Sequence, residues 1–521
     1  MEEYISMRSD KREAREAARR QRAAERGLRF YRVLAVIYSI IVLAFIGALI
    51  WINVLPAKYL FALAAVLLVI SVFIVPVMYS KHGIKKRKQI SAVLAMVLIA
   101  GFGVGTWYLT DTIGFLDDIS VGGKLTEIKE DYVVVVNNDS VYTELTQLAG
   151  AGVGTWMNSD PAYMEAKDNL QRETAVEYKY LADLNQLFNG LAAGGCETIS
   201  QTTGFAEMQE YSAVFVSSAA YESLKGEREE LAETTRVLHT VSIKVGEAAE
   251  IKTVDVTKES FNVYVSGLDF TGDISQNYHS DVNMLVTVNP VSHEVLMTSI
   301  PRDYYVKLLS RDSMDKLTHT GLYGIQETVG AVEDMMGIDI NYYVKVNYNT
   351  VVTLVDAMGG IEINSPYAFT THGMQDLNGI NFVEGYNKLD GRMALAYCRE
   401  RKSWVDGDMR RNENQQLIME AIIKKATSSS AILTNYTGIL EAVRGNMETS
   451  MTSDEMTSLV KMQLKDMPSW DIKKNALKGR NDYQFCYALG FNAAVVNQDA
   501  ERIAKAADMI FSTMNNGHDG E

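Results

Sequence analysis

The densest group of side chains that could bind an anion lies in the segment YCRERKSWVDGDMRRNENQQLI. Arg399 and Arg401 alternate, so an extended segment would direct both guanidinium groups to one face. If a helix begins near Asp408, then Asp408, Arg411 and Gln415 share one stripe of that helix. Guanidinium groups bind phosphate through paired hydrogen bonds and stay charged at any working pH. The segment predicts a cage for diphosphate oxygens, although a solvated charge run with Asp408 as the helix N-cap fits the same pattern.

Further polar residues follow the ends of predicted apolar strands. Asp269 follows the strand FNVYVSGL, and Asp281 opens the next strand. Two carboxylates that meet at a sheet edge suit Mg²⁺ or Mn²⁺, particularly where substrate phosphates supply other ligands, although each aspartate alone is also a common turn or cap residue. Arg302 and Asp303 follow the third strand, and Lys316 opens the next helical segment. Because ligands lie outside strand ends in open α/β sheets, we expect these residues at one site.

The elements that must position these residues alternate along residues 258–427. Strands are predicted for FNVYVSGL, DVNMLVTV, EVLMTSIP, INYYVKVN and IEINSPY, and helices for 319–336, 350–358, 385–397 and 408–425. The tail is predicted to add helices near 430–444, 453–465 and 499–513 and a strand near 484–488. Such alternation indicates an α/β layer architecture with a central sheet.

A smaller α/β module is predicted ahead of the main one. The segments DYVVVV and YSAVFVS read as strands, followed by helix-like stretches at 139–149 and 218–235. The glycine-rich run GAGVG follows the first of these helix-like stretches, so it does not have the strand-to-helix context of a phosphate loop. We assign this module no chemistry.

Three apolar runs near the N-terminus predict a membrane segment. Residues 31–55, 59–79 and 90–109 are each about 20 residues long, which is enough to cross a hydrocarbon core. Residues 1–29 carry nine Lys and Arg, and the 80–89 loop carries five more, whereas the turn between the first two runs has only Lys58. The positive-inside rule then places the N-terminus in the cytoplasm and everything after about residue 111 outside the cell.

Charge is divided between the two parts of the chain. The first 110 residues hold 16 Lys and Arg against 6 Asp and Glu, although the whole chain carries a net charge of -15. An acidic body argues against a nucleic-acid partner, whose contact surface should be basic. The motifs GxxxxGK[ST], GxSxG, HExxH and CxxC are absent, which argues against a P-loop enzyme, a serine esterase and a zinc enzyme. The predicted parts are a basic leader (1–29), three transmembrane helices (30–110), an accessory α/β domain (111–250) and a catalytic domain with a C-terminal extension (251–521).

In order along the chain, these motifs resemble those of the LytR-CpsA-Psr family of extracytoplasmic phosphotransferases. They are Asp269, the pair Ser280-Asp281, Pro301 to Asp303, Lys316, the pair Arg399 and Arg401, and Asp408, Arg411, Gln415 and Gln416. The resemblance implies an αβα sandwich in which Asp269 and Asp281 hold Mg²⁺ and the arginines bind the pyrophosphate of a polyprenyl lipid. Two positions depart from the family pattern: His279 and Asn414 stand where arginines are common. A histidine is only partly charged near neutral pH, so its contribution to phosphate binding is smaller.

The resemblance implies a membrane-anchored glycopolymer phosphotransferase. Its donor would be a capsule-type or teichoic-acid-type polymer on undecaprenyl pyrophosphate, its acceptor peptidoglycan, and pyrophosphate hydrolysis a side activity. Asp303 and Asp408 are both candidates for the base that accepts the acceptor's proton, and each could equally orient an arginine. The alternative is a non-catalytic regulator of envelope or capsule synthesis that binds polyprenyl phosphate in the same pocket.

Two further expectations concern apolar residues and cysteines. Stripes at 322–336 and 417–422 are typical of ordinary core, but both could line a polyprenyl site if a gap separates them. Cys196, Cys398 and Cys486 fall in the part predicted to lie outside the cell, where disulfides persist. We predict a bridge between Cys398 and Cys486, with three small buried thiols as the alternative.

Overall fold

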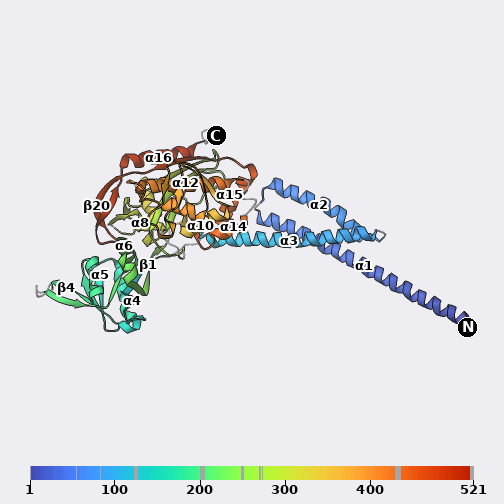
Figure 1. The fold of residues 1–521 in the computed structure, drawn as a ribbon, viewed down its shortest axis with the longest axis horizontal. Coiled ribbons are helices and arrows are strands. Elements are labelled where there is room, and N and C mark those ends of the chain that lie inside the picture. Colours follow the sequence, from blue (N-terminus) through green and yellow to red (C-terminus); the bar gives the residue numbers. More distant parts are fainter. Residues whose placement is uncertain are drawn as a thin grey trace. The chain divides into compact units, whose positions relative to one another are not determined.

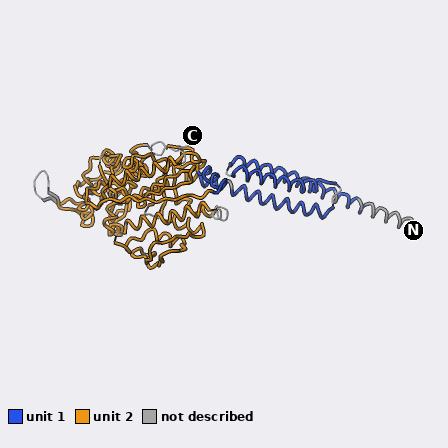
Figure 2. Tube along the Cα trace, turned by 90° about the horizontal axis from the view of Figure 1, so that it is seen from above, with its two compact units in different colours: residues 1–116, 456–467 blue, residues 117–455, 468–521 orange. Residues whose placement is uncertain are grey.

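The computed structural model describes residues 2–53, 55–81, 84–122, 127–199, 206–247, 252–268, 272, 274–311, 313–405, 407–428 and 436–516. The chain forms two compact units, which Figure 2 distinguishes by colour. Unit 1 comprises residues 1–116 and 456–467, and unit 2 comprises residues 117–455 and 468–521. Figure 1 labels the main elements along the chain.

Three long helices make up most of unit 1: α1 (Glu2–Ile52), α2 (Ala57–Tyr79) and α3 (Lys85–Ile119). All three are long and apolar enough to cross a membrane, α1 over the stretch that begins at Ala18. Tyr38, Met78 and Ala95 lie in their shared core, whereas Phe61 and Phe73 are exposed on the outside. Large exposed apolar side chains suit a hydrocarbon environment, so the three helices fit the predicted membrane segment.

Residues 127–247 of unit 2 form a five-stranded sheet, here called the accessory module, with strand order β3-β2-β6-β1-β7. Its elements are β1 (Glu127–Asn137), η1 (Leu145–Leu148), β2 (Gly152–Trp156), α4 (Pro161–Glu173), β3 (Glu177–Leu181), α5 (Leu184–Ala193), β4 (Gly195–Ile199), β5 (Ala206–Glu210), β6 (Ala213–Ser217), α6 (Ser218–Glu227), α7 (Glu230–Thr234) and β7 (Thr235–Glu247). Val133 and Val135 of β1 join the core formed with α5 and α6, whereas Tyr132 and Val134 join the core formed with α4. This alternation is the period of two of a strand that is covered on both faces.

The rest of unit 2, residues 252–455 and 468–516, is the main domain. Its six-stranded sheet has the order β18-β13-β8-β9-β10-β19. The strands are β8 (Phe261–Leu268), β9 (Ser280–Asn289), β10 (Glu294–Ile300), β13 (Tyr342–Asn347), β18 (Met447–Thr449) and β19 (Asp471–Ala476). β8 pairs antiparallel with β9, and Leu268 lies opposite Ser280. β13 is parallel to β8, and β19 from the tail is parallel to β10, so β13 and β19 are reached by crossover connections, whereas the edge strand β18 is antiparallel to β13.

Helices cover both faces of this sheet. The helices of the main domain are α8 (Leu317–Thr320), η2 (Gly321–Tyr323), α9 (Ile325–Met336), α10 (Tyr348–Ala357), η3 (Gln375–Leu377), α11 (Gly391–Arg399), α12 (Gly407–Thr427), α14 (Tyr436–Val443) and α16 (Ala500–Asn515), whereas most of α15 (Ser453–Asp466) belongs to unit 1. Tyr264 of β8 packs with Val332 of α9 and Ile510 of α16. Its neighbour Val265 points to the opposite face and packs with Met419 of α12. The main domain is therefore the predicted αβα sandwich.

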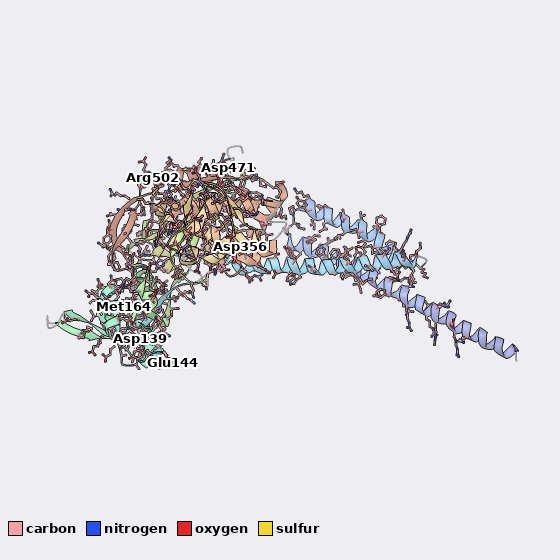
Figure 3. All side chains as sticks on the ribbon, in the orientation of Figure 1. Asp139, Glu144, Met164, Asp356, Asp471 and Arg502 are labelled. Carbon is pink, nitrogen blue, oxygen red and sulfur yellow. The ribbon has the colours of Figure 1, made fainter. Side chains whose placement is uncertain are left out.

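Two-stranded sheets complete the main domain. They pair β11 (Tyr305–Leu308) with β12 (Ser313–Lys316), β14 (Ile361–Ser365) with β17 (Gly385–Leu389), β15 (Phe369–Thr370) with β16 (Asn381–Phe382), and β20 (Arg480–Cys486) with β21 (Phe491–Asn497). Figure 3 draws all described side chains and labels Asp356 of α10. Its Oδ1 accepts a hydrogen bond from the backbone N–H of Gly391 (2.7 Å), which ties the start of α11 to α10.

Three predicted helices differ from the observed elements. The helix predicted from residue 385 begins only at Gly391, where Asp390 caps it, and the residues before it form β17. The helix predicted over 319–336 is interrupted at Gly324, whose φ of 106° falls in a region that glycine occupies readily. The helix predicted over 139–149 is reduced to the single 3₁₀ turn η1, and the glycine run after it leads into β2, where it forms strand and not a phosphate loop.

Candidate functional site

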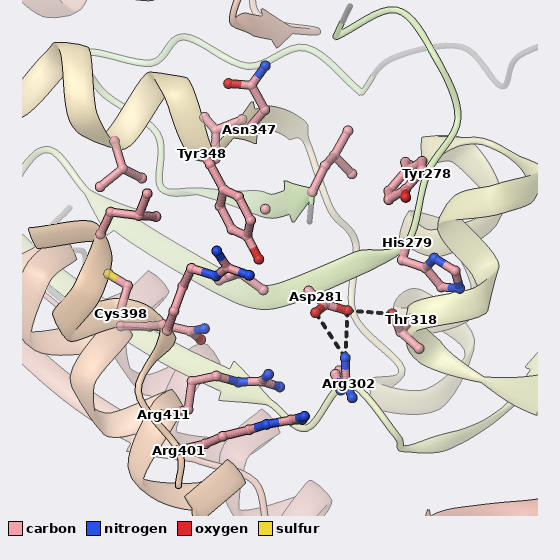
Figure 4. A pocket seen from close by; sticks show the side chains of 18 of the residues that line it. Tyr278, His279, Asp281, Arg302, Thr318, Asn347, Tyr348, Cys398, Arg401 and Arg411 are labelled. Atoms are coloured by element: carbon pink, nitrogen blue, oxygen red, sulfur yellow. Dashed lines mark hydrogen bonds and ion pairs between the residues drawn. The ribbon is translucent and has the colours of Figure 1, made fainter. Parts of the chain in front are cut away.

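A cavity of about 560 Å³ opens beside the paired ends of β8 and β9 in unit 2 (Figure 4). Its wall is built from the loop after β10, the start of α10, the end of α11, the first turns of α12, and α6 of the accessory module. The volume lies within the range of about 300 to 1,000 Å³ that is usual for ligand sites. The cavity therefore has the size and position of a ligand site at strand ends.

Four arginines that are far apart in sequence line this cavity: Arg302, Arg399, Arg401 and Arg411. Figure 4 shows Arg302, Arg401 and Arg411 directed toward the same space. The predicted convergence of the four is therefore observed. The extended segment predicted for Arg399 and Arg401 is wrong, because Arg399 is the last residue of α11 and the chain leaves the helix at Glu400. The Arg399 guanidinium lies 4.2 Å from the ring centroid of Tyr348, a cation–π contact that holds it at the cavity wall.

Asp281 is the central carboxylate of the site and is only 8% exposed. Arg302 Nη1 donates to both Asp281 oxygens, at 3.0 Å to Oδ1 and 2.9 Å to Oδ2, and Thr318 Oγ1 donates to Oδ1 at 3.0 Å (Figure 4). Burial raises the pKa of this carboxyl group, but the charges of Arg302 and Arg411 outweigh burial and lower its pKa to about 2. Asp281 is therefore a carboxylate at every physiological pH.

Asp303 and Lys316 extend this charge network. Asp303 Oδ2 lies 3.6 Å from Arg302 Nε, and its Oδ1 lies 3.8 Å from Lys316 Nζ. Lys316 is buried at the N-cap of α8, and its Nζ donates to Glu227 Oε1 of the accessory module at 3.1 Å. Asp303 thus lies between two cations, a position suited to orienting them.

His279 lines the cavity without contributing charge. Figure 4 shows His279 beside Asp281 and Thr318, and its ring centroid lies 5.6 Å from that of His319. Burial, together with the neighbouring His319, lowers the pKa of His279 to about 3. The imidazole is therefore neutral at pH 7 and offers at most a neutral hydrogen bond, which is less than the partial charge expected from the sequence.

Of the remaining predicted site residues, some line the cavity and others do not. Gln415 lines the cavity, whereas its neighbour Gln416 donates to Met297 O (3.3 Å) and Asn475 O (2.5 Å) and so ties β10 to β19. Asn414 donates to Tyr397 O at 3.1 Å and is buried. Asp269 lies outside the described residues, and the side chain of Asp408, in the first turn of α12, lies outside them as well.

An apolar wall continues from the arginines. It includes Val265, Met284, Val346, Leu395, Ile418, Met419 and Ile422. The two predicted apolar stripes separate here. Ile418 and Ile422 of α12 face the cavity, whereas Val329, Val332 and Met336 of α9 lie in the core on the other face of the sheet. One stripe is therefore part of the site, and the other is ordinary core.

Several lining residues were missed by sequence reasoning. Thr318, Asn347 and Tyr348 belong to the cavity, and all three follow strand ends, so the strand-end rule applied to β12 and β13 would have found them. Glu227 comes from the other module, and no local sequence signal connects it to Lys316.

The predicted disulfide is wrong, since Cys196, Cys398 and Cys486 are all free thiols. Cys398 lies in α11 and lines the cavity, whereas Cys486 is buried in a separate cluster around β20. Burial raises the pKa of both the Cys398 and Cys486 thiols to about 12. Both are neutral side chains that pack as small hydrophobes.

The fold and the cavity define a class: an αβα-sandwich protein with three helices long and apolar enough to cross a membrane and a cavity lined by arginines and an apolar wall. Residues 215–505 match the LytR_cpsA_psr family model, which is more than half of the chain. The protein belongs to the LytR-CpsA-Psr family, and the resemblance of its motifs is confirmed.

Three similar proteins illustrate the match. The chain is 34% identical over 213 residues to the polyisoprenyl-teichoic acid–peptidoglycan teichoic acid transferase TagU of Bacillus mycoides (strain KBAB4), covering 40% of this chain and 67% of that protein. It is 36% identical over 201 residues to TagU of Bacillus subtilis (strain 168), covering 38% and 62%. The crystal structure of B. subtilis TagV is 28% identical, covers 50% of this chain and 98% of that one, and has a TM-score of 0.42. The matched segment thus spans about two thirds of the TagU proteins.

Proposed function

We propose that this protein is a membrane-anchored phosphotransferase that moves a glycopolymer from a polyprenyl pyrophosphate to peptidoglycan. The glycopolymer would be of the teichoic-acid type, as the names of the two TagU relatives suggest. The observation that carries the proposal is the cavity itself. It joins four arginines to an apolar wall, and a lipid-linked diphosphate has the matching parts.

The chemistry would follow from these parts. A sugar hydroxyl of the acceptor attacks the glycan-bearing phosphorus, the bond between that phosphorus and the bridging oxygen breaks, and polyprenyl phosphate leaves. The hydroxyl proton passes to a base, for which Asp303 and Asp408 stay the candidates. Arg302, Arg399, Arg401 and Arg411 would neutralise the charge that spreads over the phosphate oxygens, and the apolar wall would hold the lipid in line. Catalysis would thus depend on positioning and electrostatics. Pyrophosphate hydrolysis is the side reaction expected when water replaces the sugar hydroxyl.

The proposal includes Mg²⁺, or Mn²⁺, held by Asp281 and Asp269. A carboxylate has about four lone-pair positions, and Asp281 uses three of them on Arg302 and Thr318, so one position can still face a metal. Among the described residues no group of three or more His, Cys, Asp or Glu side chains could hold a metal ion. The ion would therefore depend on substrate phosphates for its other ligands, as is common for Mg²⁺. When bound, it would offset charge on the diphosphate.

The proposal also places unit 2 outside the cell. The three helices of unit 1 and the Lys and Arg of the leader and of the 80–89 loop support this topology. Donor lipid in the outer leaflet and peptidoglycan would then meet on the same side of the membrane.

The test is a transfer assay with the full chain in detergent, a glycan linked to polyprenyl diphosphate, and a peptidoglycan glycan fragment as acceptor. We expect transfer that requires Mg²⁺ and is lost in Arg401→Gln. Arg410→Gln is the matched control, because Arg410 is close by in sequence, pairs with Glu413 at 2.7 Å and does not line the cavity. Lipid binding without transfer or phosphate release under any metal condition would contradict the proposal and favour the non-catalytic regulator.

A further inference from the structure

One wall of the cavity comes from the accessory module and has no counterpart in the motifs of the main domain. Helix α6 contributes four residues to the lining: Glu222, Ser223, Gly226 and Glu227. Glu222 and Gly226 are four residues apart, as are Ser223 and Glu227, and Ser223 and Gly226 are three apart, so the four residues share one face of the helix. Leu224 and Ala220 on another face of α6 lie in the core of the accessory module. The helix therefore presents a polar face to the site and an apolar face to its own sheet.

Two contacts hold the accessory module against the main domain, one from α6 itself and one from β1. Glu227 accepts a hydrogen bond from Lys316, whose side chain is only 8% exposed. Arg311 of the main domain forms an ion pair with Glu130 of β1, and its guanidinium lies 4.4 and 4.9 Å from the ring centroids of Tyr323 and Tyr487. A buried guanidinium held between a carboxylate and two rings fixes orientation well. Helix α6 is thus held in place at the cavity.

The α6 wall is acidic, whereas the lining from the main domain is net positive, because its four arginines and two lysines outnumber Asp281 and Asp303. The main domain lines the cavity with arginines, whereas α6 adds Glu222 and Glu227. Carboxylates would repel a diphosphate but accept hydrogen bonds from hydroxyl groups. Glu227 uses Oε1 on Lys316, and its side chain is 45% exposed, so it retains capacity to accept more hydrogen bonds.

A second observation on the same helix points to a polar ligand. Ser223 lies one turn before Glu227 in the cavity lining and is 1% exposed, and its hydroxyl has no hydrogen-bond partner among the described residues. Buried polar groups are normally paired, and an orphaned hydroxyl at a cavity wall is explained by a bound group that supplies the partner. Ser223 and Glu227 together offer a donor and acceptors, which suits a sugar.

We propose that the polar face of α6 is the acceptor subsite: it binds the hydroxyl-rich glycan of peptidoglycan through Glu227 and Ser223, opposite the arginines that bind the donor. The inference rests on the proposed function and adds a location for the acceptor. It assigns the accessory module a part in substrate selection. The donor diphosphate and the hydroxyl groups of the acceptor glycan then occupy different walls of one cavity.

Gly226 provides a probe that does not disturb the fold. A Cβ at this position would meet no atom within 4 Å, and its backbone φ is not in the left-handed region. Leucine is also a better helix former than glycine. Gly226→Leu should therefore extend a side chain into the acceptor side of the cavity, and Glu227→Gln removes the charge without changing shape. The matched controls are Ala232→Leu and Glu233→Gln in α7, which are exposed and lie outside the lining.

The experiment measures two dissociation constants for the full chain in detergent, one for polyprenyl diphosphate and one for a peptide-free peptidoglycan glycan fragment. Gly226→Leu and Glu227→Gln should each weaken fragment binding by about tenfold, roughly the loss of one charged hydrogen bond. Both variants should leave lipid binding within about twofold, and both controls should match the wild type. Thermal unfolding checks that each variant is folded, and if Gly226→Leu fails this check, Glu227→Gln carries the test.

The outcomes separate this inference from the proposed function. Equal losses for both ligands, no loss for either, or a wild-type protein that does not bind the fragment would overturn the acceptor subsite. Selective loss of fragment binding would support it even if the wild type transferred nothing, and in that case only the proposed function would fail.

Discussion

Asp281→Asn removes the charge of one carboxylate at the centre of the site. Asparagine has nearly the same shape, and its oxygen can still accept the hydrogen bonds from Arg302 and Thr318 that converge on Oδ1. What is lost is the negative charge that faces Arg302 and Arg411, together with the hydrogen bond that Oδ2 accepts from Arg302, because an amide NH2 cannot accept it. Because Asp281 is buried and accepts three hydrogen bonds, we expect its loss to have a measurable cost in stability.

The magnitude follows from the pKa of this group. Arginine charges overcome burial and lower it from 3.8 to about 2, and a shift of nearly two pKa units corresponds to roughly 2 kcal/mol. Unit 2 spans about 390 residues, and an unfolding entropy of about 2.1 cal/mol/K per residue converts this free energy into a Tm lowered by about 2 to 3 °C. The variant should also lose transfer activity, because Asp281 is a proposed metal ligand.

The pH dependence of stability tests the direction of this effect. A carboxyl whose folded pKa is depressed stabilises the protein above its unfolded pKa of 3.8 and loses that contribution as pH falls through the folded value of about 2. The Tm values of wild type and variant should therefore differ at pH 7 and converge as the pH falls from about 4 to about 2. Thermal unfolding of the full chain in detergent, followed by circular dichroism, measures this difference.

Asp334→Asn in α9 is the matched control, because Asp334 is exposed and lies outside the cavity lining. It should leave the Tm unchanged across the same pH range. Equal Tm values for wild type and Asp281→Asn at pH 7, or a difference that is as large near pH 2 as at pH 7, would refute the reasoning that the Arg302–Asp281 charge pair stabilises the site.

Four further predictions concern the donor, the metal and the topology. Arg401→Lys should raise the dissociation constant for polyprenyl diphosphate about tenfold, because a point charge cannot replace a guanidinium fork; an unchanged value would end the cage hypothesis. Ile422→Asn should weaken binding of that lipid but not of inorganic pyrophosphate, and equal losses would place the lipid chain elsewhere. EDTA should stop transfer and added Mg²⁺ restore it, with lipid binding retained; transfer in EDTA would exclude the metal. Protease added to intact wall-stripped cells should digest residues after 119 and spare residues 2–29, and a protected body would contradict the topology.

Much of the fold was predictable, because the composition of a short segment is enough to identify each central strand. The predicted segment FNVYVSGL coincides with β8, since apolar residues continue along a strand that is buried on both faces. The arginines of the site were also found, because Arg302 follows a strand and Arg411 shares a helix face with Gln415. These features depend on residues within one element, so sequence spacing was sufficient.

Other features depend on distant partners. The segment before Asp390 was predicted as helix, but GYNKL pairs with β14 more than 20 residues earlier and becomes β17. Tertiary pairing therefore overrode local preference. Arg399 reaches the cavity from a helix end that rests on Tyr348, not from an extended segment. Glu227 lines the cavity because the accessory module packs against the main domain. No residue spacing within the main domain could indicate that contact.

The position of β19 in the main sheet delays completion of the sheet during synthesis. About 170 residues separate β10 from this neighbour, and at about 5 to 20 residues per second the ribosome needs roughly 10 to 35 seconds to make them. During that interval the outer edge of β10, a strand whose residues are all buried in the finished domain, stays open to pairing with other chains. A premature stop before Asp471 would leave this edge of β10 without its partner strand, and the truncated product should aggregate more than the full chain.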